Sequence, residues 1–141
     1  MIVLPADPLH NSTVPGDYGH YEQDARTIAS WNVDYLKMDW CVPHNPANSS
    51  QKLDMEGTTT RMAKALNATG RQIWFNFHCA HTKDHRNLPI PPWCPAAGNS
   101  YRIATDHHDF WPNTALIIEF LKLGASWSAT GPNSNSSAWN E

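Results

Sequence analysis

A short apolar segment that carries charged side chains, Val33–Cys41, constrains the fold of this 141-residue chain most strongly. The apolar residues that predict a strand buried in a parallel sheet are Val33, Tyr35, Leu36 and Met38. Lys37 and Asp39 are two positions apart, so their side chains point to the same face of this strand. A charge inside such a strand costs several kcal/mol unless it is paired or used. The segment therefore predicts either a buried salt bridge or an active site at the carboxyl end of the strand.

Helical and strand patterns alternate along the rest of the chain. We expect helices at residues 21–29, 55–66 and 110–121, and strands at 33–38, 72–77 and 101–104. Gly70 and Gly124 are predicted to end the second and third helices. Short connections between alternating helices and strands favour an α/β fold with a parallel sheet, in which the apolar stripe of each helix is buried.

Three longer motifs point to one family. Residues 16–25 read G-D-Y-G-H-Y-E-Q-D-A, residues 31–41 read W-N-V-D-Y-L-K-M-D-W-C, and residues 98–111 read G-N-S-Y-R-I-A-T-D-H-H-D-F-W. Together they resemble the α-galactosidases of glycoside hydrolase family 27, whose patterns include W-G-V-D-Y-L-K-x-D-x-C and W-R-x-x-x-D-I-x-D-x-W. The resemblance covers Pro15 to Trp111, with a weaker echo at Gly131-Pro132 and Trp139-Asn140.

The resemblance implies a retaining α-glycosidase that releases terminal α-linked galactose through a covalent glycosyl-enzyme intermediate. It assigns Asp39 as the nucleophile and Asp106 as the general acid/base, with Lys37 and Arg102 contacting the sugar hydroxyls. Retaining glycosidases need two carboxyl groups about 5 to 5.5 Å apart. The alternative for Asp106 is that it caps the N-terminus of the next helix. Trp40, directly after the nucleophile, is expected either to lie at the substrate or to pack in the core.

The fold that the resemblance implies is a TIM barrel, (β/α)8, which normally needs about 250 residues. With 141 residues, the chain is expected to hold an incomplete barrel of about three consecutive βα units, as an internal fragment or an incorrect gene model would. We expect an unmatched N-terminal segment at 1–14, the partial catalytic domain at 15–132 and a polar tail at 133–141. The alternative to an active enzyme is a non-catalytic fragment or pseudoenzyme, because an incomplete barrel exposes sheet edges.

The three cysteines have different expected roles. The family commonly closes a loop with a disulfide in this region, so the resemblance implies that Cys79 and Cys94 are paired. Cys41 matches a family half-cystine whose partner lies upstream, and no cysteine precedes Cys41 in this sequence. The alternative is a zinc site formed by Cys79, Cys94 and histidines such as His81. We expect the disulfide, no metal and no other cofactor.

The expected specificity depends on residues 73–81, which read I-W-F-N-F-H-C-A-H. The family has a glutamate here that helps to recognise the sugar 2-hydroxyl, whereas this chain places His78 or Cys79 near that position. A sugar altered at this position, N-acetylgalactosamine or arabinopyranose, is therefore an alternative to galactose.

Charge and sequons bear on partners and location. A net charge of −3 gives no basic surface for nucleic acid or an anionic membrane, so the expected partner is a carbohydrate substrate. A homodimer of the full-length protein is an assembly that we leave open. Secretion or a lysosome-like compartment is expected although the chain contains no signal peptide. The N-x-S/T sequons that favour this location are at Asn11, Asn48, Asn67 and Asn135.

Overall fold

A computed structural model describes residues 17–40, 44–45, 48–79, 91–102, 107–129 and 139–140. The chain divides into two compact units, residues 1–77 and 78–141, and the boundary falls inside the strand β4. In the described residues no helix is long and apolar enough to cross a membrane.

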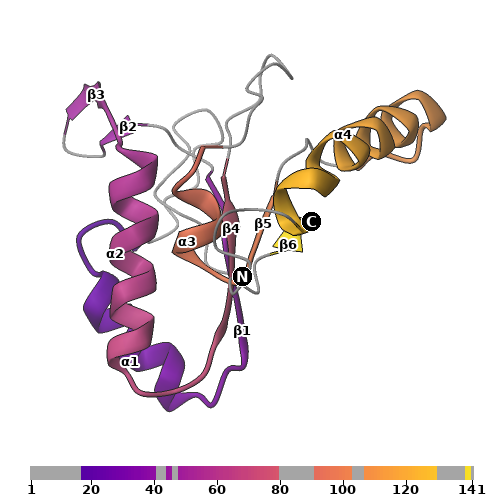
Figure 1. The fold of residues 1–141 in the computed structure, drawn as a ribbon. Coiled ribbons are helices and arrows are strands. Elements are labelled where there is room, and N and C mark those ends of the chain that lie inside the picture. Colours follow the sequence, from indigo (N-terminus) through magenta and orange to yellow (C-terminus); the bar gives the residue numbers. More distant parts are fainter. Residues whose placement is uncertain are drawn as a thin grey trace. The chain divides into compact units, whose positions relative to one another are not determined.

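The first unit contains two helices, a parallel strand pair and a small hairpin (Figure 1). Its elements are α1 (Tyr21–Ser30), β1 (Tyr35–Met38), β2 (His44–Asn45), β3 (Asn48–Lys52), α2 (Met55–Ala68) and most of β4 (Trp74–His78). The β2 and β3 strands pair antiparallel, and β3 leads into α2. The helices and strands predicted in this unit are all present, and the β2–β3 hairpin between β1 and α2 was not predicted.

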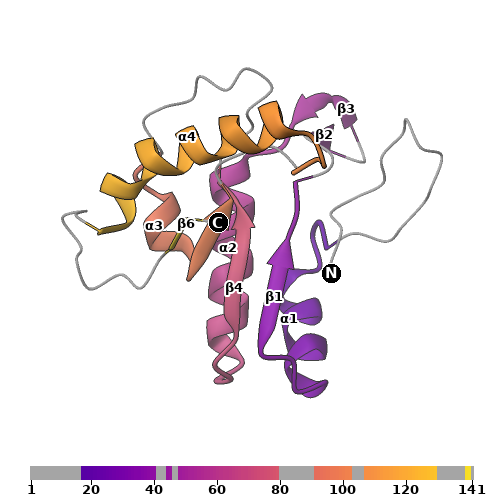
Figure 2. The same ribbon diagram turned by 90° about the vertical axis from the view of Figure 1, so that its right-hand side faces the viewer.

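β1 and β4 run parallel, in a register that pairs Tyr35 with Trp74 and Met38 with Phe77 (Figure 2). A parallel pair needs a crossover connection, which α2 provides. Side chains alternate along both strands, so Leu36 and Met38 share one face and Lys37 lies on the other.

α1 and α2 pack against each other and cover one face of this strand pair (Figures 1 and 2). The apolar side chains that are buried in this part of the core are Ala25, Ile28, Leu36, Met38, Met62, Leu66, Phe75 and Phe77. The stripes predicted for the first two helices are therefore buried as expected. Tyr35 is different, because 48% of this residue is exposed although it was predicted to lie in a buried strand. It points away from the face that the helices cover.

A residue with left-handed backbone conformation follows each of the two helices of this unit. Asn32 has φ of 58° after α1, and Gly70 has φ of +74° after α2. Glycine adopts this conformation without the strain that a Cβ causes, and asparagine tolerates it better than most residues. The end of α2 at Gly70 thus confirms the prediction.

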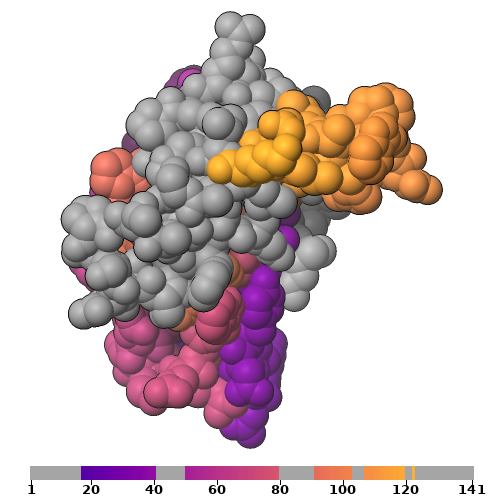
Figure 3. Space-filling model, turned by 45° about the vertical axis from the view of Figure 1, so that its right-hand side comes forward, coloured from indigo at the N-terminus to yellow at the C-terminus, as the bar shows by residue number. Residues whose placement is uncertain are grey.

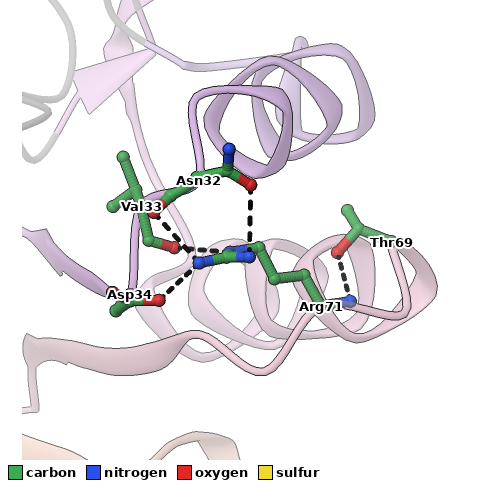
Figure 4. A network of polar contacts seen from close by, with 5 residues as sticks. All are labelled: Asn32, Val33, Asp34, Thr69 and Arg71. Atoms are coloured by element: carbon green, nitrogen blue, oxygen red, sulfur yellow. Dashed lines mark hydrogen bonds and ion pairs between the residues drawn. The ribbon is translucent and has the colours of Figure 1, made fainter.

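The side chain of Arg71 joins the loops that precede β1 and β4 (Figure 4). Its guanidinium group donates hydrogen bonds to the backbone carbonyls of Val33 and Asn32, at 3.0 Å each, and forms an ion pair with Asp34. The backbone N–H of Trp74 donates to the carbonyl of Asp34 at 2.8 Å. These contacts fix the amino ends of the two strands, opposite the ends where the candidate site lies.

The second unit contains α3 (Cys94–Ala97), β5 (Ser100–Arg102), α4 (Trp111–Ala129) and β6 (Trp139–Asn140). β5 and β6 pair parallel, with Ser100 opposite Trp139. The strand predicted at 101–104 is confirmed by β5 for residues 101 and 102, and its residues 103 and 104 lie outside the described part. β6 was not anticipated, and it falls in the segment 133–141 that we expected to be a polar tail. Trp139 suits a strand better than its polar neighbours do.

Two predictions about α4 are wrong. The helix continues through Gly124 to Ala129, because a single glycine inside a helix costs only about 1 kcal/mol and does not end it. Its apolar stripe is also not buried: Phe110 is 61% exposed and Trp111 is 72% exposed. Figure 3 shows the described part of α4 in orange. Within the described residues, the apolar stripe predicted for the third helix is therefore exposed at Phe110, Trp111 and Ile118.

Candidate active site

Strand alternation places polar side chains on the face of the β1–β4 pair that the helices do not cover. We call this the site face and define it by Tyr35, Lys37, Trp74 and Asn76. Lys37 on β1 lies directly opposite Asn76 on β4, whereas the exposed Tyr35 and Trp74 form the next pair toward the amino ends. The site face is therefore aromatic at one end and polar toward the other.

Asp39 lies immediately beyond the carboxyl end of β1 and is half-buried. Its Oδ1 accepts a hydrogen bond from the backbone N–H of Trp40 at 2.8 Å, which fixes the orientation of the carboxylate. The Trp40 side chain is buried, with 6% of the residue exposed, in the alternation that also buries Leu36 and Met38. By this alternation, Lys37 and Asp39 belong to one face at the end of the strand. Trp40 belongs to the opposite face, with Leu36 and Met38.

Arg102, the last residue of β5, is held next to a disulfide. Cys79 and Cys94 are bonded, and their Cα atoms are 5.7 Å apart, so the predicted pairing is confirmed. The backbone N–H of Cys79 donates to the carbonyl of Arg102 at 3.3 Å, and α3, which begins at Cys94, packs against β5. The disulfide therefore supports the strand that carries Arg102.

The bond between Cys79 and Cys94 also decides against the alternative zinc site, because neither sulfur is available as a thiolate ligand. His81, which that site would need, lies outside the described residues. In the described part of the chain, no group of three His, Cys, Asp or Glu residues is arranged to hold a metal ion.

Asp106 and Cys41 also lie outside the described residues, so the separation of the two predicted catalytic carboxylates stays a prediction. The alternative role of Asp106 as an N-terminal cap also falls on a residue outside the described part, whereas α4 begins at Trp111. The carbonyl of Phe110 accepts hydrogen bonds from the backbone N–H groups of Asn113 and Thr114, as the residue before a helix does.

Two histidines follow Asp106 and are tied to the first turn of α4. The Nε2 atom of His107 lies 2.9 Å from the Thr114 hydroxyl, and the backbone N–H of His108 donates to Asn113 Oδ1 at 2.8 Å. These contacts anchor the segment just after Asp106. They also give His107 and His108 structural partners of their own.

Sequence reasoning did not single out Asn76, although the structure places it opposite Lys37. The available signal was a lone polar residue in the apolar run Trp74–Phe77, at even spacing from the strand start. Asn76 is buried, and a buried amide in a strand needs a hydrogen-bonding or chemical reason to be there.

Comparison with known proteins gives one consistent result. A family model described as alpha galactosidase A matches residues 8–141. Alpha-galactosidase 2 of Arabidopsis thaliana is 34% identical over 131 residues, which cover 93% of this chain and 28% of that protein. This chain thus spans 28% of the length of that curated relative.

Solved structures share the fold. A crystal structure from Bacteroides fragilis, described as an alpha-galactosidase/melibiase, has a TM-score of 0.63 and 29% identity, covering 99% of this chain and 28% of that one. A β-L-arabinopyranosidase from Geobacillus stearothermophilus has a TM-score of 0.65 at 18% identity, covering 97% of this chain and 29% of that one. At that low identity the second match shows the fold alone.

Proposed function

Because this chain belongs to the alpha-galactosidase A family of glycoside hydrolases, we propose that the protein hydrolyses terminal α-linked galactose with retention at the anomeric carbon. The observation that carries the proposal is the placement of Lys37 and Asp39 at the carboxyl end of a parallel strand, inside the matched region. In barrel enzymes this end of the strands forms the active site. Because the chain spans 28% of the alpha-galactosidase that it matches, the proposal applies to this chain within a protein of the full length of its relatives, here called the complete gene product.

The proposed reaction has two steps. The Asp39 carboxylate attacks the anomeric carbon and forms a glycosyl ester, while the carboxyl group of Asp106 gives its proton to the leaving oxygen. The Asp106 carboxylate then removes a proton from water, which attacks the same carbon and releases Asp39 as a carboxylate. Two inversions give net retention, and each catalytic group returns to its initial state.

The remaining site residues bind and orient the sugar. Lys37 supplies a cation and hydrogen-bond donors on the site face, where it also keeps the attacking carboxylate in a favourable field. Arg102, supported by the Cys79–Cys94 disulfide, contacts sugar hydroxyls from β5. Trp40 is proposed to support Asp39 from the face opposite the site face, since the Trp40 side chain is buried.

We propose that the protein folds in a secretory compartment. The support is the disulfide, which forms and persists under oxidising conditions, together with the sequon at Asn67. Asn67 is exposed near the C-terminal end of α2, where a glycan would extend into solvent.

The proposed activity is tested with nitrophenyl α-galactoside and the complete gene product. Asp39→Asn should lower kcat by about a thousand-fold or more, because it removes the nucleophile while keeping its size. Glu56→Gln is the matched control, since it makes the same chemical change on the exposed first turn of α2. NMR of the first-formed sugar should show the α anomer.

Nitrophenyl α-N-acetylgalactosaminide and β-arabinopyranoside are assayed alongside, because the glutamate that the family uses at the 2-hydroxyl is missing near His78. If kcat/KM were higher for either of these glycosides than for the α-galactoside, that sugar and not galactose would be the proposed substrate. Inactivity on all three glycosides would contradict the glycosidase and favour a non-catalytic member of the family.

A further inference from the structure

The first unit contains a pocket of about 400 Å³ that is separate from the site face. It lies between the turn that precedes α1 and the segment that joins β3 to α2. The lining residues that matter here are Tyr18, Tyr21, Lys52, Asp54, Thr58 and Arg61. Its volume falls within the range of small-molecule sites in proteins, which is about 300 to 1,000 Å³.

One cation in the pocket is already fixed in place. Arg61 Nε lies 3.2 Å from Glu22 Oε1, and its guanidinium carbon lies 5.3 Å from the centre of the Tyr21 ring. Both contacts hold the planar group while leaving its Nη atoms without a partner among the described residues. A ligand would therefore meet a preorganised donor, which lowers the entropic cost of binding.

Two further charged groups face the pocket without an ion-pair partner in the described part of the chain, Lys52 and Asp54. Asp54 precedes α2 but makes no capping hydrogen bond through its side chain. Its Oδ2 would lie 2.3 Å from a Cβ built on Gly57, so the absent side chain at Gly57 makes room for this carboxylate. The pocket thus combines two cations with a carboxylate acceptor.

We propose that this pocket binds a neutral hexose unit of an oligosaccharide, as an accessory site outside the catalytic centre. A simple anion would be repelled by Asp54, and a simple cation by Lys52 and Arg61. Sugar hydroxyls both donate and accept, so one ring satisfies the carboxylate and the two cations together. Tyr18, which is half-buried at the pocket, adds aromatic surface for the apolar face of the ring, whereas the buried Tyr21 lies under Arg61. The choice of galactosides as probes rests on the proposed function.

Calorimetric titration of the Asp39→Asn complete gene product with stachyose tests this site, since no turnover consumes the ligand. Two classes of binding site are expected. The double variant Lys52→Met/Arg61→Met should weaken one class by about ten-fold or more, as the loss of charge-assisted hydrogen bonds does. Lys64→Met, an exposed lysine on α2 outside the pocket lining, is the control and should bind as the parent does.

Arg61→Lys keeps the charge but loses the planar group, and an intermediate affinity is expected if Arg61 contacts the sugar. Thermal unfolding of each variant checks that the fold is kept. The inference would be overturned by a single class of site in the Asp39→Asn protein. Identical titrations for that protein and for the double variant would also overturn it. Displacement of stachyose from this class by inorganic phosphate would also overturn it in favour of an anion site. If two classes of site were found in a protein that hydrolyses no glycoside, the proposed function would be refuted and the accessory site would stand.

Discussion

The guanidinium group of Arg71 donates a hydrogen bond to the backbone carbonyl of Asn32 at 3.0 Å, just where the chain turns from α1 toward β1. Asn32 has left-handed backbone, so the neighbouring structure must hold this turn in place. Arg71 does so from the loop that follows α2 (Figure 4). The two loops at the amino ends of β1 and β4 are thereby joined by one side chain.

Arg71→Ala should therefore lower the free energy of unfolding by about 2 kcal/mol, because it removes several hydrogen bonds to backbone carbonyls. Arg71→Lys should recover less than half of this loss, since an ammonium group cannot match the planar donor. Chemical denaturation measures both values. Arg26→Lys, at an exposed position on α1, is the control. Equal stability of Arg71→Ala and the parent would contradict the role of this residue.

Asp17 should make stability depend on pH. Its side chain is buried, and burial, aided by the negative charge of Asp24, raises its pKa from 3.8 to about 6. Because the pKa is higher in the folded state, the protonated carboxyl stabilises the fold at low pH, and this contribution is lost as pH rises through about 6. Between pH 4 and 7 the free energy of unfolding should therefore fall by about 1 to 3 kcal/mol, because each unit of pKa shift corresponds to about 1.4 kcal/mol.

Asp17→Asn should remove most of this dependence and raise stability at pH 7. Denaturation curves recorded from pH 4 to 7 measure it. Asp109→Asn, an exposed carboxylate in the second unit, should leave the pH dependence of the parent unchanged. A pH profile that is the same for Asp17→Asn and the parent would show that Asp17 does not titrate with the fold.

Reduction of the Cys79–Cys94 disulfide should destabilise the second unit. The cysteines are 15 positions apart, and a cross-link of this length restricts the unfolded chain by about 3 kcal/mol. The double variant Cys79→Ser/Cys94→Ser should lose this amount and bind substrate less tightly, because Arg102 loses its support. Cys41→Ser is the control. For the 141-residue chain, which has three cysteines, we expect one free thiol under denaturing, non-reducing conditions, and a count of three would contradict the pairing.

The sequence predicted the alternating helices and strands and the core of the first unit because these elements have clear apolar periodicity. The buried Ile28, Leu36, Met62 and Phe75 all follow from that pattern. The short hairpin of β2 and β3 has no such pattern, and its residues His44–Lys52 are polar and rich in turn formers. Propensity alone could not assign it.

Burial on α4 could not be predicted from its stripe, because periodicity shows which face is apolar and not whether anything covers it. Phe110 and Ile118 follow the stripe, yet they are exposed. In the candidate site, Lys37 and Asp39 were found from their charges in an apolar strand. Asn76 was missed, because its importance appears only when the register places it opposite Lys37.

The most direct test of the account is to trap the covalent intermediate. The complete gene product is treated with a fluorinated galactosyl fluoride that forms the glycosyl-enzyme but slows its hydrolysis, and the labelled peptide is sequenced by mass spectrometry. The account predicts one galactosyl adduct per chain, on Asp39. Turnover of the substrate with the label on another carboxylate, such as Asp34, or with no adduct under any trapping condition would contradict it.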